Sequence, residues 1–322
     1  MKTIVQTFFF FSILWLILVQ CQQGINDSVS PFNAMEHPKD NPATAEKIAL
    51  GKKLFFDKRL SLNNEISCAT CHVAKKALSD GRKLAKGVEG RLAFRNAPSL
   101  FNIGYAPVFM FDGEIKSLEQ QILVPILDHN EMGASMKEVI EKLGNDPAYQ
   151  AAAQKIYQRD FDTWVLTRSI ASYERTLISG NSDFDKYYYQ DKSNAISESA
   201  KRGWKLFSEK LNCIKCHSTP FFTDFKVHNN GKTALSDSDL GRFRIKNDST
   251  MIGYFKVPSL RNSSITAPYM HDGSIATLED VIEYYAKGGN GGYNQEARIK
   301  PFSITKEDKK DLINFLKSLQ DS

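Results

Sequence analysis

The hydrophobic positions of this chain recur mainly at the three- and four-residue spacing of amphipathic helices. Residues 135–144 open with the capping pattern Ser-Met-Lys-Glu, place three aliphatic side chains on one face, and stop at a glycine. The same periodicity predicts helices over residues 163–178 and 305–319. The sequence carries no alternating strand pattern. The pattern therefore predicts an all-α fold in which long loops, marked by glycine and proline, separate the helices.

The first twenty residues form a separate apolar segment. Residues 8–19 carry no charge, and Lys2 is the one charge before them. The run is short for a membrane span and fits the core of a secretory signal, which we place at residues 1–20. Cys21 then opens a polar stretch, an arrangement that resembles a bacterial lipoprotein signal and implies lipidation of Cys21. The alternatives are an ordinary signal or an uncleaved anchor, and Gln20 departs from the small residue that lipoprotein signals carry.

The composition adds limits to this picture. The 322 residues are 42% hydrophobic and 25% charged, which provides a core and excludes a disordered chain. The net charge of +5 is not gathered into a basic cluster, so we expect no nucleic-acid partner. Five cysteines are too few for a disulfide scaffold in a chain of this length. With the predicted signal, these values indicate a globular body in the periplasm, membrane-anchored if Cys21 is lipidated.

Two copies of the motif Cys-x-x-Cys-His carry the strongest chemical signal, at residues 68–72 and 213–217. In such a motif two thiols bond the vinyl groups along one porphyrin edge, and the adjacent histidine binds iron. One copy is expected by chance about 10⁻³ times in a chain of this composition. A redox dithiol or half of a zinc site leaves both histidines unexplained. The sequence therefore predicts two haem c groups, with thioether and iron ligands at Cys68, Cys71, His72, Cys213, Cys216 and His217.

The two motifs lie in two copies of one domain. The segment GKKLF (51–55) precedes the first motif, and GWKLF (203–207) precedes the second. Downstream, APSL (97–100) matches VPSL (257–260), 160 positions later. A period this long indicates two homologous domains rather than a solenoid. The predicted parts are a linker, an N-terminal haem domain and a C-terminal haem domain, at residues 21–44, 45–190 and 191–322.

With RNAPSL (95–100) and TAPYMHDG (266–273) also in view, the chain resembles the bacterial diheme cytochrome c peroxidases and the related MauG-like oxidases. The resemblance spans residues 45–320 and implies two cytochrome c-type haem domains. It further implies that the first haem meets hydrogen peroxide and the second relays electrons from a small periplasmic donor such as cytochrome c. Relatives often form homodimers.

The resemblance also assigns roles to particular residues. Glu131 matches the distal catalytic glutamate, and Gln121 matches a second distal polar group. Phe111 stands where most relatives carry a tryptophan between the haems. A calcium ion between the domains is implied, with ligands that match Asn96, Thr266 and Pro268.

Two departures from the family change the expected coordination of iron. Many relatives carry a histidine that caps the first iron until it is reduced, but residues 73–95 contain none. We therefore expect an open first iron, with His129 as the one nearby candidate cap. The family's methionine ligand to the second iron is replaced by Tyr285, as it is in MauG. A phenolate ligand favours oxidised iron, so we predict that Tyr285 binds the second iron, with Met270 as the rival ligand.

These observations favour a peroxidase that reduces hydrogen peroxide to water. The first alternative is a MauG-like diheme oxidase that modifies a protein side chain, which Tyr285 and the missing capping histidine favour. The second alternative is a non-catalytic diheme electron carrier. Such a carrier would have no use for a distal carboxylate such as Glu131.

Overall fold

The computed structural model of the protein describes residues 30–321, so Cys21 and the predicted signal lie outside the described residues. The chain divides at residue 30, and the residues from Pro31 onward form one unit. This unit is mainly helical, as the sequence pattern predicts, and its two strands, β1 (Val227–His228) and β2 (Phe255–Lys256), pair antiparallel. Within residues 30–321, no helix has the length and apolar character needed to cross a membrane.

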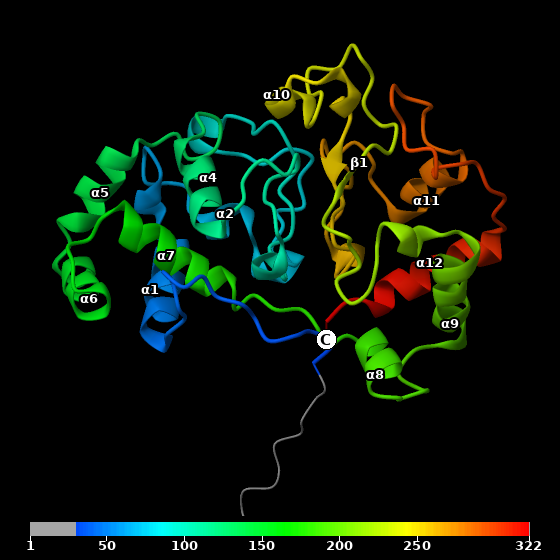
Figure 1. Cartoon of the computed structure of the whole chain (residues 1–322), viewed down its shortest axis with the longest axis horizontal. Coiled ribbons are helices and arrows are strands. Elements are labelled where there is room, and N and C mark those ends of the chain that lie inside the picture. Colours follow the sequence, from blue (N-terminus) through cyan, green and yellow to red (C-terminus); the bar gives the residue numbers. More distant parts are fainter. Residues whose placement is uncertain (1–29, 322) are drawn as a thin grey trace, which may run out of the picture. The chain divides into compact units, whose positions relative to one another are not determined.

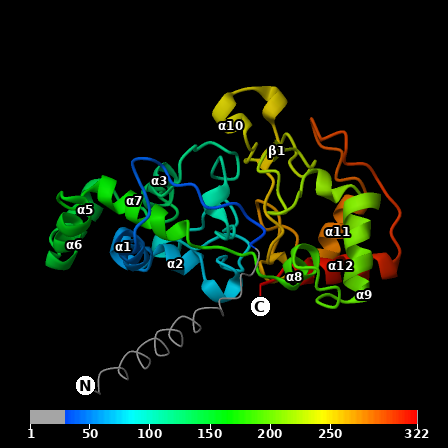
Figure 2. The ribbon, with the colours of Figure 1, turned by 60° about the horizontal axis from the view of Figure 1, so that its bottom comes forward.

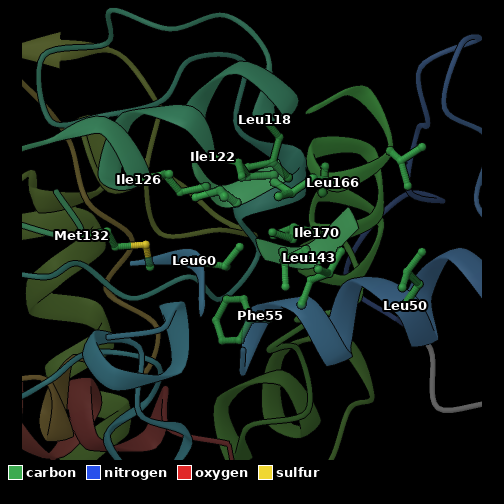
Figure 3. Close-up of a cluster of buried hydrophobic side chains, with 14 of the residues drawn as sticks. Leu50, Phe55, Leu60, Leu118, Ile122, Ile126, Met132, Leu143, Leu166 and Ile170 are labelled. Carbon is green, nitrogen blue, oxygen red and sulfur yellow. The ribbon is translucent and has the colours of Figure 1, made fainter. Parts of the chain in front are cut away.

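The helices before residue 180 lie together in Figure 1 and contribute to the first of two large hydrophobic clusters. They are α1 (Ala45–Phe55), α2 (Cys68–Cys71), α3 (Leu118–Gln121), α4 (Leu123–Leu127), α5 (Met136–Gly144), α6 (Pro147–Tyr157) and α7 (Thr163–Glu174). Figure 3 shows the cluster, to which α1 contributes Phe55, α4 contributes Ile126 and α7 contributes Ile170. This core lies directly beside the first cysteine motif, because Cys68 and Ile66 pack against it.

Four of the later helices contribute to a second hydrophobic cluster, namely α8 (Asp183–Tyr189), α9 (Glu198–Lys205), α11 (Leu278–Ala286) and α12 (Lys306–Ser318). The short helix α10 (Phe243–Lys246) supplies none of its residues. Phe315 of α12 and Phe207 lie at its centre, together with Phe184 of α8, which precedes residue 191. Cys213 and Ile214 of the second motif pack against this cluster. Each cysteine motif therefore has a hydrophobic core of its own.

A glycine in each GxKLF segment permits a close helix crossing at the same place in both halves. A Cβ atom on Gly51 of α1 would lie 1.8 Å from the Ser169 carbonyl oxygen of α7. A Cβ atom on Gly203 of α9 would lie 2.0 Å from the Asp311 carbonyl oxygen of α12. The pairs α1–α7 and α9–α12 are thus packed backbone to backbone, and α9 and α12 lie together in both views (Figure 2). The repeated sequence segment therefore makes the same kind of close helix crossing in both halves.

Charged and aromatic side chains join the two halves. Arg95 makes ion pairs with Asp112 from its own half and Asp239 from the other, at 3.1 and 2.6 Å. Arg244 pairs with the same Asp112 at 2.8 Å. The Asp112 carboxylate is fully buried, so it depends on these two guanidinium groups for its charge compensation. The network fixes the segment that carries Phe111 against the second half.

The helices predicted from sequence differ from the structure mainly at one end. The Ser135–Glu138 capping box is present, and α5 ends at Gly144 as predicted. The predicted terminal helix is α12, capped by Thr305. The helix predicted over 163–178 ends at Glu174 instead. Beyond that end the Arg175 side chain binds Glu119 at 2.7 Å, and hydrogen bonds of the following residues close a tight turn.

Candidate haem sites and active site

The first cysteine motif forms one capped helical turn, α2. The Ser67 backbone N–H donates to the Thr70 hydroxyl at 3.0 Å, which satisfies a donor at the start of the turn. At its end, Nδ1 of His72 lies 2.8 Å from the Leu78 carbonyl oxygen. A carbonyl can only accept, so Nδ1 carries the proton and Nε2 keeps its lone pair. Burial lowers the pKa of His72, which favours the neutral imidazole that binds metals.

A cavity lies beside this motif. Its lining brings together five residues that the sequence singled out: Cys68, Cys71, His72, Gln121 and Glu131. Most of the exposed cavity wall is apolar, with Ile66, Leu100 and Met132 among the lining side chains. An apolar cavity with a few convergent polar groups is typical of a cofactor site.

Glu131 reaches the cavity from a turn that follows α4. The turn closes through the Glu131 N–H, which donates to the Asp128 carbonyl oxygen at 3.1 Å. Burial raises the pKa of Glu131 to about 7, and the neighbouring Asp128 carboxylate adds to the rise. A carboxyl group with this pKa is half ionised near neutral pH, which suits a group that accepts a proton and returns it.

Gln121 enters the same cavity from the end of α3, and its amide nitrogen lies 3.9 Å from the Met110 sulfur. His129 does not line the cavity. It is exposed, and its Nδ1 lies 3.0 Å from the Arg91 guanidinium. The structure therefore places the one local candidate for a histidine cap at the surface.

The sequence reasoning missed a second buried carboxylate in this cavity, Glu174. Its side chain is 4% exposed, and Oε2 has no hydrogen-bond partner. Burial raises the pKa of Glu174 to about 8, while Arg175 lowers it and Glu119 raises it. Glu174 is the last residue of α7. The sequence pattern gave no indication of a function at this position, and only the packing of α7 places Glu174 in the cavity.

The second motif repeats the arrangement of the first. Residues Cys213–Lys215 form a 3₁₀ turn, and Nδ1 of His217 lies 3.1 Å from the Phe222 carbonyl oxygen. Burial lowers the pKa of His217 as well. The hydroxyl of Ser99, in the APSL segment, donates to the Ala77 carbonyl oxygen at 2.7 Å. The hydroxyl of Ser259, in the VPSL segment, donates to the Phe221 carbonyl oxygen at 2.6 Å. In both halves the same segments thus support the loop that orients the histidine.

Tyr285 of α11 lies close enough to the thiols of Cys213 and Cys216 for them to affect its pKa. Burial raises the pKa of Tyr285, a hydrogen bond from Asn230 opposes this rise, and the two thiols add to it. The Asn230 amide nitrogen lies 3.3 Å from the Tyr285 hydroxyl and 3.5 Å from the Met270 sulfur. The two rival ligands therefore meet at one amide, which the sequence reasoning missed.

The remaining predicted residues lie where the two halves meet. The Lys256 N–H donates to the Phe111 carbonyl oxygen, and the Arg95 guanidinium lies 5.9 Å from the centre of the Phe111 ring. The Asn96 N–H donates to the His271 carbonyl oxygen at 2.8 Å, and its amide nitrogen donates to the Arg82 carbonyl oxygen. Thr266 and Pro268 precede His271 on the same loop, but no hydrogen bond among residues 30–321 joins them to Asn96.

The residues present fit two covalently bound haems. None of the four motif thiols is in a disulfide, and each motif places a neutral histidine with a free Nε2 beside two thiols. The unpartnered Glu174 oxygen faces a cavity, which is consistent with a group that fills it when the protein is loaded. Haem iron held in this way supplies the redox chemistry, and the protein supplies the surrounding acids, amides and apolar walls.

Comparisons with known proteins identify the family of this chain. The family model for di-haem cytochrome c peroxidases matches residues 45–193. The chain is 39% identical to the methylamine utilization protein MauG of Methylorubrum extorquens over 289 residues, covering 89% of this chain and 82% of that one. It is 32% identical to the cytochrome-c peroxidase IdrP1 of Pseudomonas sp. strain SCT, covering 90% and 85%.

A solved structure of a MauG-like protein associated with microbial copper homeostasis superposes with a TM-score of 0.84. That pair is 32% identical and covers 90% of this chain and 94% of the other. The chain belongs to the family of diheme cytochrome c peroxidases and MauG proteins. It is an oxidoreductase, and membership of this family implies two haem c groups.

Proposed function

We propose that this protein reduces hydrogen peroxide to water with electrons from a small periplasmic donor such as cytochrome c. The observation that carries the proposal is the meeting of His72, Glu131 and Gln121 in one cavity. The reaction consumes one H₂O₂, two electrons and two protons and forms two H₂O. Glu131 takes a proton from one peroxide oxygen and returns it to the other as the O–O bond breaks. Gln121 orients the bound peroxide through its amide.

The test is peroxide turnover with reduced cytochrome c, measured for the wild type, Glu131→Gln and Glu174→Gln. Both variants replace a carboxyl group that lines the same cavity with an amide of nearly the same size. We expect Glu131→Gln to lose about 10² to 10⁴-fold in turnover, and Glu174→Gln to keep most of it. Equal turnover of the wild type and Glu131→Gln would show that the distal assignment is wrong.

The MauG-like alternative is supported by the position of Tyr285 beside the second motif. An oxidase of this kind delivers the oxidising equivalents to a protein side chain rather than to a small donor. Sustained oxidation of excess reduced cytochrome c by peroxide separates the two functions. A peroxidase should show it, whereas the substrate of such an oxidase is a protein side chain rather than the small donor. The electron carrier is separated from both, since peroxide would leave its ferric Soret band unchanged.

We also propose that residues 45–190 and 191–322 form the N-terminal peroxidatic and C-terminal relay haem domains. Two separate hydrophobic clusters and the matching Gly51 and Gly203 crossings support this division. Phe111, which lies where the halves meet, is then the aromatic residue between the haems. Replacing Phe111 with leucine and measuring the rate of electron transfer between the haems tests this role.

A calcium ion between the halves is part of the proposal, with Asn96, Thr266 and Pro268 as ligands. Asn96 is buried, its hydrogen bond to His271 holds it near that loop, and its amide oxygen is left available because the nitrogen faces Arg82. Amide and carbonyl oxygens are suitable calcium ligands. Metal analysis before and after EGTA treatment, for the wild type and Asn96→Leu, tests this site.

Export to the periplasm follows from residues 1–20, and lipid attachment at Cys21 is the further step that we propose. Both rest on the sequence alone. The mass of the mature protein and its distribution between membrane and soluble fractions, compared for the wild type and Cys21→Ala, test them.

A further inference from the structure

The side-chain amide of Asn230 contacts both candidate ligands of the second iron. Its nitrogen lies 3.3 Å from the Tyr285 hydroxyl oxygen and 3.5 Å from the Met270 sulfur. An amide nitrogen carries two hydrogens, so it can serve both acceptors at once. The arrangement brings the oxygen and the sulfur to one point from two different elements, α11 and the loop that precedes it.

The orientation of this amide is fixed by its oxygen. The Lys232 backbone N–H donates to the Asn230 Oδ1 atom at 3.1 Å. Because a backbone N–H requires an acceptor, the nitrogen is the atom that faces Tyr285 and Met270. The Tyr284 hydroxyl also donates to the Asn230 carbonyl oxygen at 2.9 Å and ties the same turn to α11.

The residues on either side hold the turn in place. Asn229 is fully buried, and its amide nitrogen donates to the carbonyl oxygens of Ile252 and Tyr293, both at 2.8 Å. Gly231 has a φ of +80°, and a Cβ atom there would lie 1.8 Å from the Gln295 Oε1 atom. The sequence Asn229-Asn230-Gly231 thus forms a rigid turn whose middle side chain points at the two rival ligands.

An N–H donor does not stabilise the two ligands equally. A hydrogen bond to an ionised oxygen is about twice as strong as one between neutral groups, whereas a thioether sulfur is a weak acceptor. When the phenol oxygen is bound to iron it carries negative charge, and the amide then stabilises it. The same amide engages the sulfur of Met270 through its other hydrogen.

We propose that Asn230 is a positioning residue that selects Tyr285 rather than Met270 as the outer ligand of the second haem iron. The inference rests on the proposed assignment of Tyr285 and goes beyond it, because it names the group that decides between the two side chains. The first half offers a comparison. There the Gln121 amide lies 3.9 Å from Met110, the repeat position of Met270, with no tyrosine at the same amide.

The experiment uses the protein loaded with both haems. Asn230→Leu and the nearly isosteric Asn230→Asp both remove the donor, and Tyr284→Phe is the matched control, because it breaks a hydrogen bond to the same turn without touching the amide. The readouts are the absorption and electron paramagnetic resonance spectra of the ferric second haem, and its reduction potential. We expect both Asn230 variants to shift the ratio of oxygen to sulfur ligation at least tenfold towards sulfur and to raise the potential.

The double variant Asn230→Leu/Met270→Leu should lose the sulfur-ligated signal, which identifies its source. Unchanged spectra and potential in both Asn230 variants, together with an altered spectrum in Tyr285→Phe, would overturn the selecting role and leave the Tyr285 assignment intact. An unchanged Tyr285→Phe spectrum would instead overturn the assignment itself. A Tyr284→Phe protein that changes as much as Asn230→Leu would show that only the integrity of the turn matters, and would also overturn the proposal.

Discussion

The backbone N–H of Val88 donates a 2.8 Å hydrogen bond to the carbonyl oxygen of Glu131. This bond joins the loop after the first cysteine motif to the turn that carries the candidate catalytic carboxylate. Arg91 strengthens the contact, because its guanidinium donates to the His129 carbonyl oxygen at 2.7 Å. The segment in which many relatives carry a capping histidine therefore braces the Glu131 turn in this protein.

Replacing Gly87 with alanine should displace that turn. A Cβ atom on Gly87 would lie 2.1 Å from the Asn130 carbonyl oxygen and 2.3 Å from that of Glu131. A displacement near 1 Å can cost about 10²-fold in rate, so we expect peroxide turnover to fall by about this factor. Gly90→Ala is the control for backbone strain in the same loop: its φ of +77° disfavours alanine, but its Cβ atom would meet only the flexible end of Lys86 and would not push on the Glu131 turn. Similar losses of turnover in the two variants would contradict this account.

The reaction with peroxide should depend on pH through Glu131. Its pKa is about 7, and the ionised form accepts the proton, so the rate should rise with pH through 7 and fall below it. Stopped-flow measurements from pH 5 to 9 should give this single inflection for the wild type and a flat, much lower profile for Glu131→Gln. An inflection that persists in Glu131→Gln and disappears in Glu174→Gln would assign the proton transfer to Glu174.

Alanine at either crossing glycine should destabilise the fold. At Gly51 and Gly203 the added carbon would lie within 2.0 Å of a carbonyl oxygen on the facing helix, so the helices must separate. We expect a loss of about 3 kcal/mol or more in the free energy of unfolding, measured with denaturant. Gly144→Ala is the control, because its nearest neighbour would be 3.7 Å away, and its stability should change by less than about 1 kcal/mol.

The Arg261–Asp185 pair should contribute stability that depends on pH. Both side chains are fully buried and lie 2.7 Å apart, so Arg261→Met should cost about 3 to 5 kcal/mol at pH 7 by leaving Asp185 without a partner. Burial alone would raise the pKa of Asp185, but Arg261 lowers it below its usual range. A lowered pKa gives stability that is present above the unfolded value of about 3.9 and is lost as pH falls below it.

The difference in stability between the wild type and Arg261→Met should therefore shrink on acidification. Denaturant unfolding at several pH values between 3 and 7 measures this difference. Lys137→Ala, which removes an exposed pair with Glu141 at 3.9 Å, should change stability by less than about 0.5 kcal/mol at every pH. A constant penalty for Arg261→Met across this range would indicate lost packing rather than a lost charge partner.

Much of the fold was predictable because its signals are local. Capping residues act within one helical turn; the structure confirms the predicted cap at Ser135 and shows that Thr305 caps the predicted last helix. The end of α7 was not predicted. Directly after it Arg175 pairs with Glu119, 56 positions earlier in the chain, and no local pattern shows such a contact. A periodic pattern shows which face of a helix is apolar, but it does not show which distant charged residue will lie beside the end of the helix.

The same distinction applies to the candidate site. The cysteine motifs are contiguous in sequence, and the resemblance to a known family supplied Glu131 and Gln121, which the structure brings into the same cavity. Glu174 and Asn230 carry no motif. They come to their sites only through the packing of α7 and the turn before Gly231, so the sequence offered no means of selecting them from other buried polar residues.

His72 and His217 each present Nδ1 to a backbone carbonyl, that of Leu78 and that of Phe222. Carbonyl partners of the same kind give the two imidazoles nearly the same electron-donating strength toward iron. Differences in redox behaviour between the two centres would then come from the other residues around each motif, such as Glu131 near the first and Tyr285 near the second. The duplicated halves could therefore take separate tasks while both keep the inherited support of the histidine.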